Sequence, residues 1–145
     1  MIEVIAVLLV IGIVAAVVIS RSTSTDSYSV VSEADILKSN LRFAQLKSMG
    51  SDSAVIWGIT VAAGSYTLTC STTDAVNDPC PTTLLLPGDN SATHTFASGI
   101  TVTAGTGAIT FDNWGSPIQG ARTITLSGGS ETATVAITAN SGFIP

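Results

Sequence analysis

This 145-residue sequence has few side chains that could act in catalysis or bind a metal, and they lie far apart in the sequence. Glu3 stands at the start of an uncharged apolar run, and His94 is the single histidine. Asp74, Asp78 and Asp89 could suggest a calcium site, but they lack the alternating carboxylate spacing of a calcium-binding loop. The sequence has no Gly-x-Ser-x-Gly motif, no phosphate-binding glycine loop and no haem attachment motif. We therefore expect no catalytic residue, no metal site, no cofactor and no enzymatic activity.

Cys70 and Cys80 enclose nine residues, and the polar segment STTDAVNDP between them has the composition of a loop. A zinc site would need about four ligands, which two cysteines and a distant His94 do not supply. The pair therefore predicts a disulfide and an oxidising compartment, with two unlinked buried thiols as the alternative. Closing this short loop would stabilise the fold by about 2.5–3 kcal/mol through chain entropy.

Glu3 precedes a segment, residues 4–19, that contains no polar side chain. As a helix, residues 2–19 would be roughly 27 Å long, close to the roughly 30 Å hydrocarbon core of a bilayer. An ionised carboxylate within that core costs about 2.5–3.5 kcal/mol, and Arg21 lies at the opposite end of the run. The amino terminus of another copy could pair with Glu3 and make it an assembly residue. A carboxylate solvated at the headgroup level is an equal alternative.

Two further interpretations of the apolar segment explain less. A cleavable signal peptide would place basic residues before the run and a small-residue cleavage motif after it. Here Glu3 precedes the run, and the sequence SRSTSTDS follows it. A plain membrane anchor explains the length of the segment but leaves Glu3 without a role.

The run IEVIAVLLVIGIVAAVVIS resembles the N-terminal segment of type IV pilins and type II secretion pseudopilins. In that family a glutamate leads an apolar helix that contains a glycine and a following alanine pair. The resemblance implies that the segment resides in the inner membrane and then becomes the packed core of a helical filament. It also implies that Glu3 pairs with the methylated amino terminus of an adjacent subunit. The assembly residues expected on this pattern are Met1, Ile2, Glu3, Gly12, Ala15 and Ala16.

Two features depart from the family pattern. The family glutamate usually follows four mature residues, so we expect the sequence to lack the first two, with maturation at Met1 as the alternative. Many pilins carry a kinking proline near the position of Ser20, whereas the first proline here is Pro79. Glycine, serine and threonine weaken a helix, so we expect any stretching of a filament to occur between Gly12 and Ser24.

A second periodic segment follows the apolar run. Its apolar residues step by three or four positions, which predicts one buried helical face: Val30, Ala34, Leu37, Leu41 and Ala44. Ser32–Asp35 resembles a capping box, and Gly50 is the expected C-terminal cap. Lys38, Arg42 and Lys47 lie off this stripe, where they either face solvent or pair with the acidic heads of neighbouring subunits.

From Ser53 the apolar period changes to two, which predicts strands. We expect a hairpin from alternating residues at 55–61 and 66–68, then strands at 82–86, 94–103, 107–112, 121–127 and 131–138. Trp57 and Trp114 are assigned to core or turn packing rather than to a binding platform. The strings around Trp57, FDNWGSP and NSGFIP resemble heads of mannose-sensitive-haemagglutinin-type pilins and H-type minor pseudopilins.

The predicted fold is α+β, a long N-terminal helix with a hydrophobic first half, packed on an antiparallel β-sheet head. Its parts are a membrane and filament-core helix at 1–20, the second half of the helix at 21–50, and a head at 51–145 with a disulfide loop at 70–80. Net charge is −5, and four of the five basic residues precede residue 50, so nucleic acid is not an expected partner.

The function expected from the resemblance is a structural subunit of a type IV pilus-like extracellular filament. The alternative is a minor pilin or pseudopilin that primes a pilus or a type II secretion pseudopilus, and a membrane-anchored binding module is a third interpretation. The expected partners are other copies of the chain, the bacterial inner membrane before assembly, a prepilin peptidase and the pilus assembly machinery. The expected final location is a filament on the cell surface.

Overall fold

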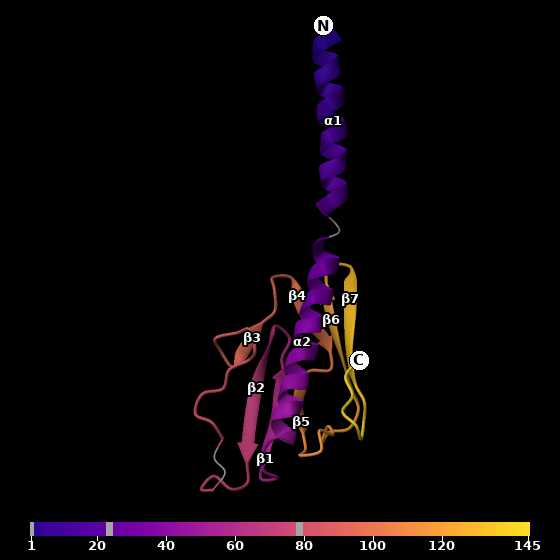
Figure 1. Cartoon of the computed structure of the whole chain (residues 1–145). Helices are drawn as coiled ribbons and strands as arrows, with labels where there is room; N and C mark the ends of the chain where they lie inside the picture. The colour runs from indigo at the N-terminus through magenta and orange to yellow at the C-terminus, as the bar shows by residue number, and fades with distance from the viewer. Residues whose placement is uncertain (1, 23–24, 78–79) are drawn as a thin grey trace.

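The computed structural model describes residues 2–22, 25–77 and 80–145, apart from the side chains of residues 18–28. The described residues form two helices and seven strands, and the strands make two antiparallel sheets (Figure 1). The α+β class predicted from the sequence is therefore confirmed. The helices are α1 (Ile2–Ser22) and α2 (Thr25–Met49). The strands are β1 (Val55–Val61), β2 (Ser65–Thr72), β3 (Thr93–Thr95), β4 (Ile100–Ala104), β5 (Gly107–Phe111), β6 (Arg122–Gly128) and β7 (Glu131–Ile137).

The first sheet has four strands in the order β3-β2-β1-β5, and the second has three in the order β4-β6-β7. The predicted hairpin is formed by β1 and β2, with Val61 opposite Tyr66 and Trp57 opposite Cys70. β1 and β5 approach so closely that a Cβ atom at Gly58 would lie only 2.3 Å from a backbone oxygen of β5. A residue with a side chain at this position would force the two strands apart.

α2 lies across both sheets, in contact with β1, β5, β6 and β7 (Figure 1). Its predicted apolar stripe is confirmed, because each of the five residues is at most 3% exposed: Val30, Ala34, Leu37, Leu41 and Ala44. The strands contribute alternate residues to the same core, in which Ile59, Ile109 and Ile124 have no exposed surface. Burial of this stripe stabilises α2, since most helical stability in proteins comes from packing rather than from propensity.

The predicted end of α2 is confirmed, whereas the capping box at Ser32–Asp35 is wrong. Gly50 follows the last helical residue, and its N–H donates to the Leu46 carbonyl at 3.0 Å. This bond satisfies one of the free carbonyls at the helix end. Residues 32–35 lie inside α2, where Asp35 pairs with Lys38 at 3.4 Å instead of capping a helix start.

Two predicted strands differ from the structure. Residues 82–86 form no strand, because the Leu86 N–H donates to the Ser91 carbonyl at 2.9 Å and closes a loop ahead of β3. Leu86 still enters the core, at 2% exposure, which accounts for its apolar character. The strand predicted at 94–103 divides into β3 and β4, which belong to different sheets. Gly99 lies between them with a φ of 85°, a conformation that glycine adopts at little cost.

Candidate functional site

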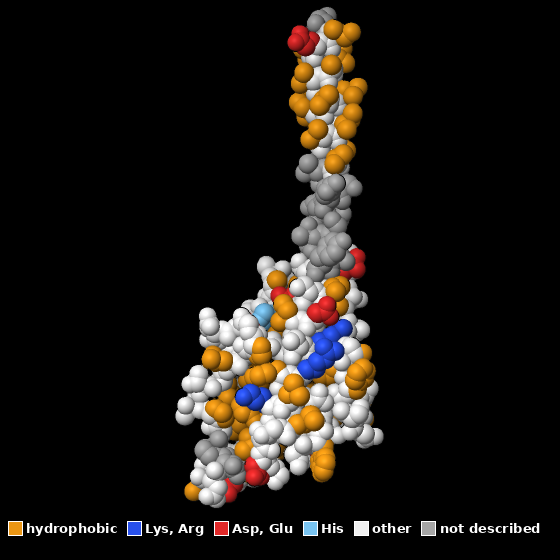
Figure 2. Space-filling view, in the orientation of Figure 1, with side chains coloured by type: hydrophobic (Ala, Val, Ile, Leu, Met, Phe, Trp, Pro, Cys, Tyr) orange, Lys and Arg blue, Asp and Glu red, His pale blue; other side chains and the backbone are white. Residues whose placement is uncertain are grey.

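α1 is an apolar helix without a polar face, and Figure 1 shows it standing clear of the head. From Ile2 to Val17 every described residue is exposed, and the large apolar side chains among them are 53–85% exposed (Figure 2). Within the described residues, no helix combines the length and the apolar content needed to cross a membrane. The expected continuation of α1 into α2 passes through residues 23 and 24, which lie outside the described residues.

The predicted assembly residues lie along α1, except that Met1 is outside the described residues. Glu3 is exposed in the first helical turn, and no cation in the described part of this one copy forms a salt bridge with it. Gly12, Ala15 and Ala16 are three and four positions apart, so they share one face of the helix. A Cβ atom added at Gly12 would meet nothing within 4 Å, so the isolated chain leaves this small-residue face open.

A part-buried polar cluster that the sequence did not reveal joins α2 to an edge of the first sheet. His94, on β3, lies with Nε2 3.0 Å from Glu33 Oε2 and with Nδ1 2.8 Å from Asp89 Oδ2. The other oxygen of Glu33 accepts a hydrogen bond of 3.1 Å from the Ala97 N–H. Glu33 is 8% exposed, and the contacts with His94 and the Ala97 N–H compensate the cost of burying its carboxylate.

The charge on His94 is favoured by this arrangement. Burial opposes the charged form, but the hydrogen bonds and charges of Glu33 and Asp89 outweigh it and raise the pKa of His94 above its usual value. Both imidazole nitrogens can then donate, one to each carboxylate. The cluster consequently links helix α2, the loop that carries Asp89, and strand β3, with His94 bridging the two carboxylates.

Tyr66 and Asn40 extend this cluster into the core. The Tyr66 ring stacks on the His94 ring, with centroids 5.0 Å apart and planes 28° from parallel. Asn40 Nδ2 donates to the Tyr66 hydroxyl at 2.7 Å, and neither residue is more than 1% exposed. Burial is the largest influence on Tyr66 and raises its pKa to about 12, with smaller increases from the charges of Asp89 and Glu33. The hydrogen bond from Asn40 acts in the opposite direction.

The spacing of polar residues in α2 is a sequence signal for this cluster, although the cluster matches no known motif. Glu33, Asn40 and Ser48 recur at helical spacing beside the apolar stripe, and they are the three buried polar residues of the described structure. A polar group on the buried side of a helix needs a partner from elsewhere in the fold. Ser48 follows the same rule, because its hydroxyl donates to the Phe111 carbonyl at 2.5 Å.

The basic residues of α2 all have contacts within their own chain. Lys38 pairs with Asp35, and Arg42 donates to the Ile144 carbonyl at 2.8 Å. The Lys47 ammonium lies 5.5 Å from the centroid of the Phe43 ring and 5.7 Å from that of Trp57. Their pairing with the heads of neighbouring subunits stays a prediction.

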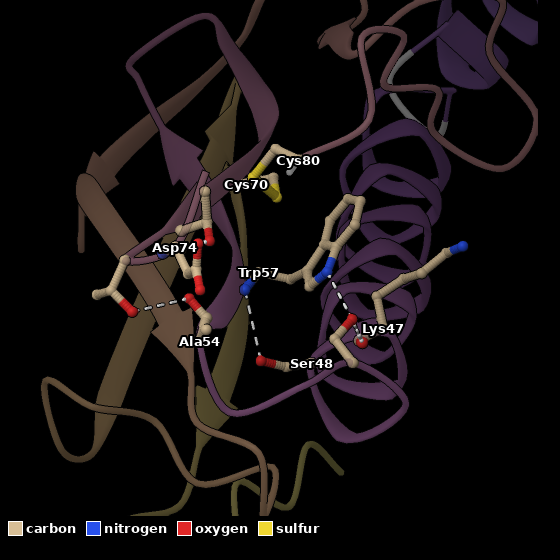
Figure 3. Close-up of a disulfide and its surroundings, with 10 residues drawn as sticks. Lys47, Ser48, Ala54, Trp57, Cys70, Asp74 and Cys80 are labelled. Carbon is tan, nitrogen blue, oxygen red and sulfur yellow. Dashed lines mark hydrogen bonds between the residues drawn. A yellow bond between two sulfur atoms is a disulfide. The ribbon is translucent and has the colours of Figure 1, made fainter. Parts of the chain in front are cut away.

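The predicted disulfide between Cys70 and Cys80 is confirmed (Figure 3). It ties the loop after β2 back to that strand, next to the indole of Trp57, which is 5% exposed. The Trp57 Nε1–H donates to Ser51 Oγ at 2.9 Å. Trp114 differs, because it is 80% exposed in a turn closed by Asp112, whose carboxylate accepts from the Trp114 N–H at 2.9 Å.

Of the residues suggested for calcium, the two that the structure describes, Asp74 and Asp89, have separate partners. Asp89 binds His94, whereas the Asp74 carboxylate accepts a hydrogen bond from the Asn77 side chain, and Asp78 lies outside the described residues. Within residues 2–22, 25–77 and 80–145, no group of three or more His, Cys, Asp or Glu side chains is placed to hold a metal ion. No protein-family model matches the sequence, and comparison with curated proteins and with solved structures found no match either.

Proposed function

We propose that the protein is a structural subunit of a type IV pilus-like extracellular filament, assembled through its N-terminal hydrophobic helix. One observation carries the proposal: α1 extends from a well-packed head with all of its described apolar side chains exposed. Exposed apolar surface of this extent marks a site of association with other molecules. The resemblance of residues 2–20 to pilin N-termini supports other copies of the chain as the partner.

The magnitude of the exposed surface supports burial of α1 in the functional form. Eleven large apolar side chains on α1 are at least half exposed. Full burial of a fully exposed side chain of this kind contributes about 1.5–3 kcal/mol, and these side chains are 53–85% exposed. Burying the surface that is still exposed therefore contributes roughly 10–20 kcal/mol in all, which is comparable to the roughly 5–15 kcal/mol stability of a typical domain. We propose that the inner membrane holds the helix first, and that helix packing in the filament replaces lipid. Gly12, Ala15 and Ala16 would let neighbouring backbones approach closely.

Glu3 has a specific role in this proposal. Its carboxylate would pair with the methylated amino terminus of an adjacent subunit after a prepilin peptidase has processed the precursor. A charge pair that forms only in one arrangement of subunits would set their register along the filament. The assembled polymer would then leave the membrane through the pilus machinery and reach the cell surface.

The test is the yield of filaments from the Glu3→Gln variant, measured by electron microscopy and by shearing the cells. We expect a loss of most filaments, because the amide keeps the shape of the side chain but removes its charge. Glu131→Gln, an exposed carboxylate on β7, is the matched control and should assemble normally. Normal filament yield from Glu3→Gln would overturn the role of Glu3. A trace of wild-type protein in sheared filaments, rather than a dominant band, would favour a low-copy subunit that primes a pilus or pseudopilus.

A further inference from the structure

A groove of about 290 Å³ lies between α2 and the segment that follows the disulfide. Its lining is mainly apolar: Phe43 from α2, Trp57 and Leu68 from the first sheet, and Leu84 and Leu85 from the segment opposite. Leu85 is 50% exposed, although its two leucine neighbours are more buried. Figure 2 shows hydrophobic side chains gathered on this side of the head.

Lys47 places a positive charge at the groove. Its ammonium lies 5.5 Å from the centroid of the Phe43 ring and 5.7 Å from that of the Trp57 ring. Figure 3 shows the Lys47 side chain beside the Trp57 indole. In the described part of the chain, no carboxylate forms a salt bridge with Lys47. An apolar groove beside an ammonium favours an occupant that presents a short apolar side chain together with a carboxylate.

The loop within the disulfide presents that combination. Val76 is 88% exposed, more than any other large apolar side chain in the described residues. Two positions before it, the Asp74 carboxylate accepts hydrogen bonds from the N–H groups of Val76 and Asn77, at 3.2 and 3.1 Å. The Asn77 side chain also donates to it, at 2.8 Å, and these bonds lower the pKa of Asp74. Val76 therefore lies next to an ionised carboxylate, in a turn that the hydrogen bonds to Asp74 hold in place.

We propose that Val76 of one copy docks in the Lys47 groove of a second copy, with the Asp74 carboxylate beside the Lys47 ammonium. The two features occur on one chain, yet Val76 stays almost fully exposed, so they do not meet within a single copy. Complementary patches at different places on identical molecules make a head-to-tail contact, which repeats into a helical polymer unless it closes into a ring. The contact rests on the proposed filament and gives its heads a second attachment besides α1.

Crosslinking between two separately made variants of the full chain tests this contact. Val76→Cys and Leu85→Cys proteins are mixed, assembled by detergent removal and treated with a short bismaleimide. The native cysteines do not react, because no described cysteine is free. We expect a crosslinked dimer in the mixture and not in either protein alone. Ile118→Cys, 53% exposed and outside the groove, replaces Leu85→Cys as the matched control and should give no dimer.

A charge exchange tests the partners directly. Lys47→Glu or Asp74→Lys alone should lower the crosslink yield about fivefold, because each places like charges together in a partly solvated contact. The two substitutions combined across the mixed copies should restore most of the yield. If the Lys47→Glu mixture, the Asp74→Lys mixture and the mixture that combines them all gave the same crosslink yield, the proposed pairing of these charges would be overturned.

Protection of Leu85→Cys provides a measurement that needs no crosslink. In filaments, a water-soluble maleimide should label this residue at least fivefold more slowly than in detergent-solubilised monomers. Unchanged labelling together with no crosslink, in filaments that form normally, would overturn the docking and leave the proposed function standing. Absence of filaments from the wild-type chain would contradict the proposed function itself. Protection without a crosslink would mean that something other than the Val76 loop fills the groove, and it would also overturn the inference.

Discussion

His94 Nε2 lies 3.0 Å from Glu33 Oε2, and this contact joins β3 to α2 across 61 positions of sequence. β3 is an edge strand of its sheet and has only three residues, so its few ladder hydrogen bonds hold it weakly. The contacts of His94 with the Glu33 and Asp89 carboxylates attach β3 to α2 and to the preceding loop, which compensates for its few ladder hydrogen bonds. The charged contact therefore adds to the apolar packing and the hydrogen bonds that hold the rest of the head against α2.

The stability of the head should depend on pH through His94. Because the pKa of His94 is raised in the folded state, its contribution is fully present below about pH 6.5 and is lost as the pH rises through the folded pKa. His94→Gln should lower the free energy of unfolding by about 1.5–3 kcal/mol at pH 6, and by less at pH 9. Denaturant unfolding at both pH values measures this. Equal losses at pH 6 and pH 9 would show that the charge on His94 does not contribute.

The Asn40–Tyr66 hydrogen bond should make the two residues energetically coupled. Asn40→Ala leaves the buried Tyr66 hydroxyl without its partner and should cost about 1–3 kcal/mol. In a Tyr66→Phe background the same substitution should cost less, since no orphaned hydroxyl remains. A double-mutant cycle from unfolding curves gives the coupling energy, and strictly additive losses would contradict it.

Ionisation of Tyr66 should require unusually alkaline conditions. Its raised pKa of about 12 means that the folded state favours the protonated phenol, so stability should fall as the pH rises from about 10 toward 12. Ultraviolet absorbance of the phenolate follows this titration, and Tyr66→Phe removes the late component. A single tyrosine transition near pH 10 in the folded protein would be inconsistent with the burial of Tyr66.

Leu37 should be among the most sensitive positions of α2. It has no exposed surface and packs between helix and sheets, so Leu37→Ala should destabilise the head by about 2–5 kcal/mol through lost burial and a cavity. Leu46→Ala is the matched control on the same helix, because Leu46 is 66% exposed, and it should change stability by less than about 0.5 kcal/mol. Similar losses for the two variants would mean that α2 does not pack as described.

Removal of the disulfide should loosen the loop and the groove without unfolding the sheets. Cys70→Ser with Cys80→Ser should cost about 2.5–3 kcal/mol through the greater entropy of the unfolded chain. Hydrogen exchange should rise in residues 73–77 and 81–86 and stay slow in β6 and β7. Uniformly faster exchange would indicate that the disulfide holds the whole head together rather than this loop.

The predictable parts of the fold are those governed by local periodicity. The apolar residues of α2 step by three and four, and those of β1 alternate, so each pattern carries its own secondary structure. Residues 82–86, two threonines and three leucines, have the composition of a strand but no alternation. The Leu86–Ser91 hydrogen bond makes them part of a loop, and that bond depends on tertiary placement. The polar cluster escaped prediction for the same reason, because nothing near His94 in sequence specifies Glu33 as its partner.

The disulfide could be predicted because its two cysteines are close in sequence and lack competing ligands. The groove could not, since Lys47, Trp57 and Leu85 converge only when α2, β1 and the loop after the disulfide have packed. Glu3 differs from the groove, because its position before the apolar run suggests a role from sequence alone. In a single copy, no described residue forms a salt bridge with it.

Electron cryo-microscopy of the full-length protein after detergent removal tests the central claim most directly. The proposed function predicts helical fibres with α1 packed in their core and with the Glu3 carboxylate within salt-bridge distance of a neighbouring amino terminus. A stable monomer, or fibres in which α1 lies outside the core with Glu3 in solvent, would contradict it.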